Sequence, residues 1–308
     1  MILSVCPNPS VDTYVHFSSF TPQEVNRATM EQPFPGGKGT HVAMGIKELG
    51  EEVSLLGFWA GPSGQWIKHQ LEEKGIRCIG PEVEGWTRTC YTFKTGDDFN
   101  ETEILGLGPT VSKNDISTFY ELYNNELESA NSVVMSGSWP QGAPDNSYAV
   151  LIGFANKHKV PVVLDATGDL LANAIQKHPA AIHLNKSEAA AFTGKQNIMG
   201  MLMALAENIE VAAVTDGKNG LFYLNNKKVL HGNVLIDKVV SAVGSGDSLT
   251  AGLTVAMLRG YNNEGTVRLS VACGAANCLR HELGMFYKKD VERLLNKVVV
   301  EEFKMEIA

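Results

Sequence analysis

The chain is long enough to form one large globular unit, and it is acidic. It has 308 residues, of which 44% are hydrophobic, and a formal net charge of −8 at pH 7. A chain of this size can bury a large core, and its charge argues against nucleic acid or an anionic membrane as partner. Its five cysteines form no C-x-x-C pair, so we expect neither disulfides nor a zinc site. It shows no apolar run near the ~18 residues of a membrane span and no signal peptide, which predicts a cytoplasmic protein.

The first third of the chain has the pattern of short strands separated by turns. Strands are predicted at 11–17, 27–34, 89–94 and 101–105. The alternation of polar and apolar residues from Thr13 to Phe17 indicates a sheet with one buried and one open face. After the second strand, a helix-like run leads to Leu49 and ends at Gly50.

From about Ser132 onward the sequence alternates between strands and helices. Apolar strands are predicted at 132–135, 161–165, 181–184 and 211–215, and helices at 148–158 and after Ser248, Glu264 and Asp290. This rhythm predicts an α/β fold with a mostly parallel sheet covered by helices on both faces. Ligands bind beyond the carboxyl ends of such strands. The polar residues that fall at these ends are Ser136, Asp165, Asn185 and Thr215.

A glycine cluster, Val243-Gly244-Ser245-Gly246-Asp247-Ser248, directly precedes an apolar helix pattern. Successive backbone N–H groups in such a cluster can face one concavity, and the helix behind it adds its positive end, so Gly244, Ser245 and Gly246 are candidates for an anion hole. A carboxylate there would repel phosphate, but it could serve as the base for a hydroxyl that attacks a phosphoryl group. Asp247 is therefore either the catalytic base or only the N-cap of the helix.

A second cluster, Pro35-Gly36-Gly37-Lys38-Gly39-Thr40-His41, opens the first helix. It is not a Walker A loop, because Gly39 follows the lysine where that motif needs Ser or Thr. The other cluster is not a dinucleotide fingerprint, because Leu249 stands where the third glycine belongs, which disfavours a nicotinamide oxidoreductase. The segment is either a plain turn or a ligand-binding loop. In the second case the glycines would let a polyhydroxy ligand lie against the main chain, and the charge of Lys38 would bind the phosphate of that ligand.

Together the two clusters resemble the motifs of the ribokinase-like carbohydrate kinases, the PfkB family. One matches in P-G-G-K-G and the other in V-G-S-G-D. Shorter matches follow in the same order at 8–12, 25–27, 87–88, 102–105, 108–112, 136–138 and 185–188, so the resemblance covers essentially the whole chain. This set is similar to the branch that acts on phosphorylated ketohexoses, the 1-phosphofructokinases and tagatose-6-phosphate kinases.

The resemblance implies an architecture and a set of ligands. The expected fold is a single ribokinase-like domain over 1–308, with a small β-sheet lid drawn from about 11–35 and 88–106. The expected ligands are a sugar phosphate, ATP and Mg²⁺. Because the lid strands would keep one apolar face after covering the sugar, we expect a homodimer formed through the lid.

The resemblance also assigns roles on the sugar side of the site. Asp12 would accept hydrogen bonds from sugar hydroxyls, and Ser138 would support the sugar from a strand end. The glycines Gly36 and Gly37 and the ring of His41 would also face the sugar. The cations Arg27, Lys38 and Arg88 would bind the phosphate already present on the substrate. Without the resemblance, Asp12 and Ser138 could be turn residues and the cations solvated surface charges.

On the nucleotide side, the resemblance places Thr215, Gly217 and Gly220 along the phosphates and Asn277 near the adenine. Asn185 and Glu188 match the element that organises magnesium, with Glu188 acting through water. Asn followed three residues later by Glu is also a helix capping box, and both readings can hold together.

Three departures from the family pattern bear on the substrate. His41 stands where the family usually has Asn, Cys90 replaces a polar residue, and Leu105 gives T-E-I-L in place of T-E-I-N. Leu105 and the serine of V-G-S-G-D favour tagatose 6-phosphate, with fructose 1-phosphate as the alternative. A sensor that kept the fold and lost turnover is the alternative from another class, and the presence of Asp247 argues against it.

Overall fold

A computed structural model describes residues 1–303, in which one large sheet runs through the molecule. Its strand order is β16-β15-β14-β13-β12-β11-β10-β1-β4-β6. Neighbouring strands are parallel from β13 to β6 and antiparallel from β13 to β16. The strands are β1 Ile2–Val5, β4 Val53–Leu56, β6 Arg77–Ile79, β10 Ser132–Ser136, β11 Val162–Asp165, β12 Ala181–Asn185, β13 Val211–Thr215, β14 Leu221–Asn225, β15 Lys228–Asn233 and β16 Val299–Glu302.

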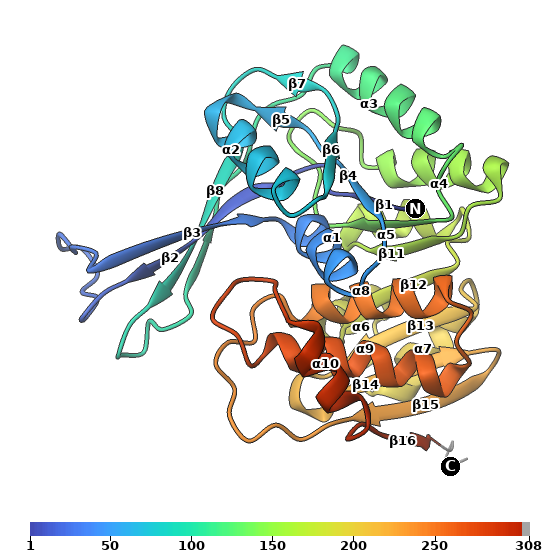
Figure 1. Ribbon diagram of the computed structural model, residues 1–308. Coiled ribbons are helices and arrows are strands. Elements are labelled where there is room, and N and C mark those ends of the chain that lie inside the picture. Colours follow the sequence, from blue (N-terminus) through green and yellow to red (C-terminus); the bar gives the residue numbers. More distant parts are fainter. Residues whose placement is uncertain (304–308) are drawn as a thin grey trace.

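Helices cover both faces of this sheet and bury a separate hydrophobic core on each (Figure 1). One core is packed by α3 Lys113–Glu126, α4 Ser147–His158, α5 Gly168–Ile175, α6 Lys186–Thr193 and α7 Ile198–Ala206. The other is packed by α1 Lys38–Glu48, α2 Gly61–Glu72, α8 Ser245–Leu258, α9 Asn263–Asn277 and α10 Lys288–Leu295. The inner strands are apolar on both sides because both faces are covered. The predicted fold class is confirmed.

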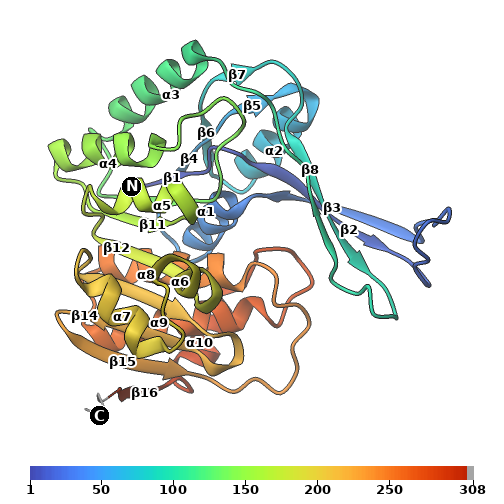
Figure 2. The same cartoon turned by 180° about the vertical axis from the view of Figure 1, so that it is seen from behind.

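A second sheet of four strands, here called the lid, projects from the edge of the main body (Figures 1 and 2). Its order is β3-β2-β8-β9, with β2 Ser10–His16, β3 Met30–Gly36, β8 Arg88–Lys94 and β9 Glu103–Leu105. The short strands β5 Trp59–Ala60 and β7 Glu82–Val83 pair separately. The four predicted lid strands are all present, each shifted by one to three residues.

The start of α8 differs from its prediction. The helix begins at Ser245, before the apolar pattern starts, and its N-cap is Gly244 with a φ of 81°. Asp247 therefore lies inside the first helical turn, and the N-cap alternative for it is wrong. Glycine takes the cap position because this left-handed backbone is costly for other residues. Among the helices of residues 1–303, none is long and apolar enough to cross a membrane.

Candidate active site

A large cavity lies where the lid faces the carboxyl ends of the parallel strands. Its volume is about 1090 Å³, enough for two small-molecule ligands side by side. The ends of β11, β12 and β13 form one wall with Asp165, Asn185 and Thr215. The amino-terminal ends of α1 and α8 form another, and β2, β8 and β9 of the lid close the third. The strand-end residues predicted to fall at one edge do so; Ser136 pairs with Asp165 across β10 and β11, but it is buried and does not line the cavity.

The first turn of α8 presents backbone donors to this cavity. The N–H of Ser245 donates to the carbonyl of Ala242, at 3.1 Å, and so is already paired. Within residues 1–303, the N–H groups of Gly246 and Asp247 have no such acceptor, as expected at a helix start. The backbone donors left free at this helix start are therefore those of Gly246 and Asp247, one position later than the sequence suggested.

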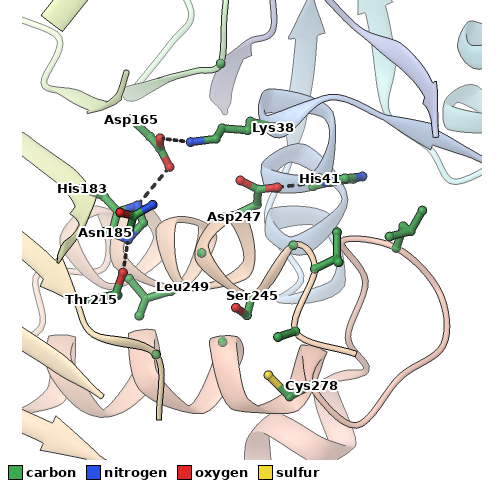
Figure 3. Close-up of a pocket in the computed structure, with 18 of the residues that line it drawn as sticks. Lys38, His41, Asp165, His183, Asn185, Thr215, Ser245, Asp247, Leu249 and Cys278 are labelled. Carbon is green, nitrogen blue, oxygen red and sulfur yellow. Dashed lines mark hydrogen bonds and ion pairs between the residues drawn. The ribbon is translucent and has the colours of Figure 1, made fainter. Parts of the chain in front are cut away.

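Asp247 is buried at the cavity wall and is held by a histidine from another helix (Figure 3). Nδ1 of His41 on α1 lies 2.9 Å from Oδ2 of Asp247. On the other side of the same ring, Nε2 lies 3.4 Å from Oδ2 of Asp12 on the lid strand β2. Burial alone would lower the pKa of His41, but the hydrogen bond to Asp247 and the charges of both carboxylates raise it above its ordinary value.

Lys38, at the start of α1, and Asp165, at the end of β11, form an ion pair in the cavity (Figure 3). Nζ of Lys38 lies 2.9 Å from Oδ1 of Asp165, while Oδ2 is 3.0 Å from Nδ1 of His183. Nε2 of His183 reaches the hydroxyl of Thr215 at 3.2 Å, so a continuous chain of polar contacts crosses three strand ends. The hydroxyl of Thr250 lies a further 3.4 Å from Oδ2 of Asp165.

Neighbouring charges decide the protonation of this pair. Burial would raise the pKa of Asp165, but Lys38 and His183 hold it well below its usual range. Burial opposes the charge of Lys38 as well, yet the carboxylates around it raise its pKa above the ordinary lysine value. Both groups are therefore charged at neutral pH.

Asn185 and Glu188 form the capping box of α6. The side chain of Asn185 accepts from the N–H of Glu188 at 2.9 Å, and Oε2 of Glu188 accepts from the N–H of Asn185 at 2.8 Å. The remaining oxygen, Oε1, lies 3.6 Å from Nζ of Lys38 and lines the cavity. The capping alternative is thus correct, and it leaves one carboxylate oxygen available for a ligand.

Arg88 and Ser138 line the cavity near the base of the lid. Arg88 donates from Nε and Nη2 to the carbonyl of Asn8, at 3.2 and 2.9 Å, which fixes its guanidinium at the base of the lid. The amide of Asn8 also contacts the hydroxyl of Ser138, at 3.5 Å. An adjoining pocket of about 470 Å³ shares these three residues and extends along Gly106 to Ala143. Nη1 of Arg88 lies a further 3.5 Å from the carbonyl of Gly106, so the guanidinium lies among backbone carbonyls where the two pockets adjoin.

Most of the predicted site residues line the cavity, and three do not. Those that do are Asp12, Gly37, Lys38, His41, Arg88, Ser138, Asn185, Glu188, Thr215, Gly217, Gly220, Gly244, Ser245, Gly246 and Asp247. Gly36 lies just behind, against the carboxyl group of Asp12. Arg27 is exposed in the loop between β2 and β3, so its expected phosphate contact is not supported within one chain. Asn277 is buried outside the cavity lining and donates to the carbonyl of Met285, so its adenine contact stays a prediction.

Two parts of the site have no motif in the sequence. His183 was not identified, because a lone histidine inside an apolar strand has no pattern of its own. The other omission is a stretch without helix or strand between β15 and α8, which lines the cavity with Val234, Ile236 and Val239. Its run of apolar residues outside any regular element was the available signal.

Comparisons with known proteins agree with this geometry. The family model of the pfkB family carbohydrate kinases matches residues 8–289. The chain is 34% identical over 306 residues to a Bacillus subtilis (strain 168) protein named 1-phosphofructokinase, covering 97% of this chain and 99% of that one.

Solved structures share the fold. One is a Thermotoga maritima protein described as a possible 1-phosphofructokinase, with a TM-score of 0.89, 23% identity and coverage of 98% of this chain and 99% of that one. Another is phosphofructokinase-2 from Escherichia coli in complex with potassium, with a TM-score of 0.87, 21% identity and coverage of 96% and 98%. The chain therefore belongs to the pfkB family of carbohydrate kinases, and it is an ATP-dependent phosphotransferase that acts on a sugar.

Proposed function

We propose that this protein is a 1-phosphofructokinase, which transfers the γ-phosphoryl group of ATP to fructose 1-phosphate and forms fructose 1,6-bisphosphate. The observation that carries the proposal is the 34% identity to a protein of that name over almost the full length of both chains. The sequence cues for tagatose 6-phosphate are weaker. They rest on single residues, and Leu105, although it lines the cavity from β9, is 63% exposed.

In this proposal Asp247 is the general base. It takes the proton of the attacking sugar hydroxyl as the new P–O bond forms and the bond to the ADP oxygen breaks. Its Oδ2 is tied to His41, which leaves Oδ1 for the hydroxyl. The N–H groups of Gly246 and Asp247 would hold the oxygens of the transferred group. This arrangement places base and anion hole in one helical turn.

On the sugar side, Asp12 and Ser138 would bind hydroxyls, and Arg88 would bind the phosphate already on the substrate. On the nucleotide side, Thr215, Gly217 and Gly220 would follow the phosphates, and the apolar stretch with Val234 and Ile236 would contact the base. Lys38 lies between the sugar side and the nucleotide side of the proposed site. It would give up its ion pair with Asp165 to contact a phosphate.

The residues present fit a magnesium ion bound mainly through nucleotide phosphates. Among residues 1–303, no cluster of three or more His, Cys, Asp or Glu could hold a metal alone. Magnesium usually keeps several waters and needs only one or two carboxylates. Oε1 of Glu188, next to Asn185, would supply that contact through water. Bound there, the ion would neutralise negative charge on the phosphates.

The lid exposes apolar side chains that support the expected homodimer. Tyr91 and Ile104 are cross-strand partners that are 39% and 51% exposed, on the face of the lid opposite to the cavity-lining Cys90 and Leu105. Neighbouring apolar side chains of this exposure favour an interface between copies. Light scattering should therefore give twice 33.4 kDa at micromolar concentration, and a mass of one chain would contradict the dimer. The expected cytoplasmic location stays a prediction.

A product assay tests the proposed substrate. With ATP and magnesium fixed, kcat/KM is compared for fructose 1-phosphate, tagatose 6-phosphate, fructose 6-phosphate and fructose. We expect fructose 1-phosphate to exceed the others by at least about tenfold, a difference of about 1.4 kcal/mol in transition-state binding. A preference for tagatose 6-phosphate would instead support the substrate prediction made from Leu105. Binding of sugar phosphate without turnover of any substrate would indicate a sensor.

A further inference from the structure

His41 lies between two carboxylates that come from different parts of the fold. Asp247 belongs to α8 in the main body and Asp12 to β2 in the lid, while His41 sits on the second turn of α1. Nδ1 is 2.9 Å from Asp247 Oδ2 and Nε2 is 3.4 Å from Asp12 Oδ2. Each ring nitrogen thus faces one carboxylate oxygen.

The neutral imidazole cannot satisfy this arrangement. It has one N–H, and the other nitrogen carries a lone pair. With Nδ1–H donating to Asp247, the lone pair of Nε2 would point at the carboxylate of Asp12. Nε2 is buried and makes no hydrogen bond of standard geometry with residues 1–303. A proton on Nε2 would turn this contact into an attraction.

The surroundings fix the ring in this position. Gly284 has a φ of +60°, and a Cβ built on it would lie 2.0 Å from Cγ of His41, so its bare backbone packs against the imidazole. On the other side, a Cβ on Gly36 would lie 2.1 Å from Cγ of Asp12. Only glycine allows these approaches. The backbone thus holds both the ring and one of its carboxylate partners.

We propose that His41 is a positioning residue that is doubly protonated at neutral pH and ties the base Asp247 to the sugar-binding carboxylate Asp12. The role of Asp247 as base rests on the proposed function, whereas the charge on His41 does not. Through this contact the lid and the first turn of α8 keep a fixed distance. The base therefore stays aligned with the sugar that the lid covers.

The other charged groups nearby do not offer His41 an alternative partner. Lys38, on the same helix, is itself a cation; it is paired with Asp165, and its charge also interacts with Asp247. Glu103 on β9 is an acidic neighbour of Asp12 and Asp247; burial, followed by these charges, raises its pKa. The two carboxylates in contact outweigh the burial of the ring, in line with the raised pKa of His41. Stabilisation by the charged ring should be complete below the ordinary histidine pKa of about 6.5 and be lost as pH rises above it.

An NMR titration of the ligand-free protein tests the charge directly. Histidine side chains are labelled with ¹⁵N, and the His41 signal is assigned from its absence in His41→Asn. We expect an imidazolium at pH 6.5 that loses its proton only at higher pH, and a lower titration midpoint in Asp12→Asn. A ring that is neutral throughout pH 6 to 8, or a midpoint unchanged in Asp12→Asn, would overturn the proposal. This readout does not depend on any substrate.

Kinetics test the positioning role. In wild type, kcat/KM for fructose 1-phosphate should fall on the alkaline side by about tenfold, the size expected for losing one hydrogen bond to a charged group. His41→Asn keeps a donor near the position of Nδ1 but cannot titrate, so it should lose this alkaline step. His158→Asn, at an exposed position in α4, should leave the profile unchanged. An alkaline step that persists in His41→Asn would contradict the proposal, whereas absence of turnover with a normal NMR titration would contradict only the proposed function.

Discussion

Nζ of Lys38 lies 2.9 Å from Oδ1 of Asp165, although 127 positions separate the two residues in the chain. Lys38 opens α1 directly after a lid strand, and Asp165 ends β11 in the main sheet. The pair therefore joins the base of the lid to the carboxyl-terminal edge of the parallel strands. Asp165 is buried, whereas the side chain of Lys38 is 41% exposed, so the lysine is the partner that can turn toward a ligand.

Lys38→Met should lower the free energy of unfolding at pH 7 by about 1–3 kcal/mol. Breaking a fully buried ion pair costs about 3–5 kcal/mol. The smaller loss is expected here because the side chain of Lys38 is partly exposed. The physical reason is that Asp165 stays buried with only His183 and Thr250 near its charge. Since folding lowers the pKa of Asp165, its contribution is complete above the ordinary value of about 3.9 and is lost progressively as pH falls from there through the lower folded-state pKa, so only a part is lost at pH 3.5. Urea unfolding at pH 7 and pH 3.5 measures both effects.

Lys113→Met is the matched control, because Lys113 is exposed at the start of α3. It should change stability by less than about 0.5 kcal/mol. A difference between wild type and Lys38→Met that grows toward acid pH would contradict the sign of this argument.

Asp247→Asn should abolish turnover and preserve binding. Asparagine keeps an oxygen that can accept from His41 but cannot take a proton from the sugar. We expect kcat to fall by at least about 10², while the affinities for ATP and fructose 1-phosphate change little. Steady-state kinetics measure the first quantity and calorimetry the second. The exposed Asp98→Asn serves as control, and an Asp247 variant with more than about a tenth of the wild-type kcat would rule out the base role.

Arg88→Met should raise KM for fructose 1-phosphate by about 10–100-fold, the effect of removing a charged hydrogen bond to phosphate. Turnover of unphosphorylated fructose should change little, because that sugar has no phosphate for Arg88 to contact. This second substrate separates lost recognition from a damaged lid, since damage would slow both reactions. Arg293→Met, exposed on α10, is the control and should resemble wild type.

Gly284→Ala should destabilise the protein more than Gly260→Ala. Both glycines have a left-handed backbone, with φ of +60° and +66°. A Cβ at Gly284 would lie 2.0 Å from His41, whereas one at Gly260 would meet nothing within 4 Å. The difference should be about 1–3 kcal/mol, the cost of overpacking a filled site. Thermal unfolding of the two variants measures it, and equal losses would show that the ring can move aside.

The sequence allowed much of the fold to be predicted, because strand and helix periodicity is local. The strand 211–215 was placed to the residue, and the other predicted strands were placed within a few positions. The antiparallel edge formed by β14, β15 and β16 was not predicted, since pairing partners depend on contacts that are distant in sequence. Arg27 and Asn277 were assigned to the site by motif position, and only the fold shows that one is exposed and the other is beneath the wall.

What the sequence alone determined is the set of reactive groups: the glycines that bare the backbone, the carboxylate of Asp247 and the cations near it. These groups can be read from residue types and short spacings, because such patterns determine the local backbone geometry and the reactive side chains. Only the tertiary structure decided which groups meet. It paired Lys38 with Asp165, and it set His41 between Asp247 and Asp12. Such contacts depend on how α1, α8 and the lid pack together, and the orientation of packed elements is a property of the whole core rather than of any segment.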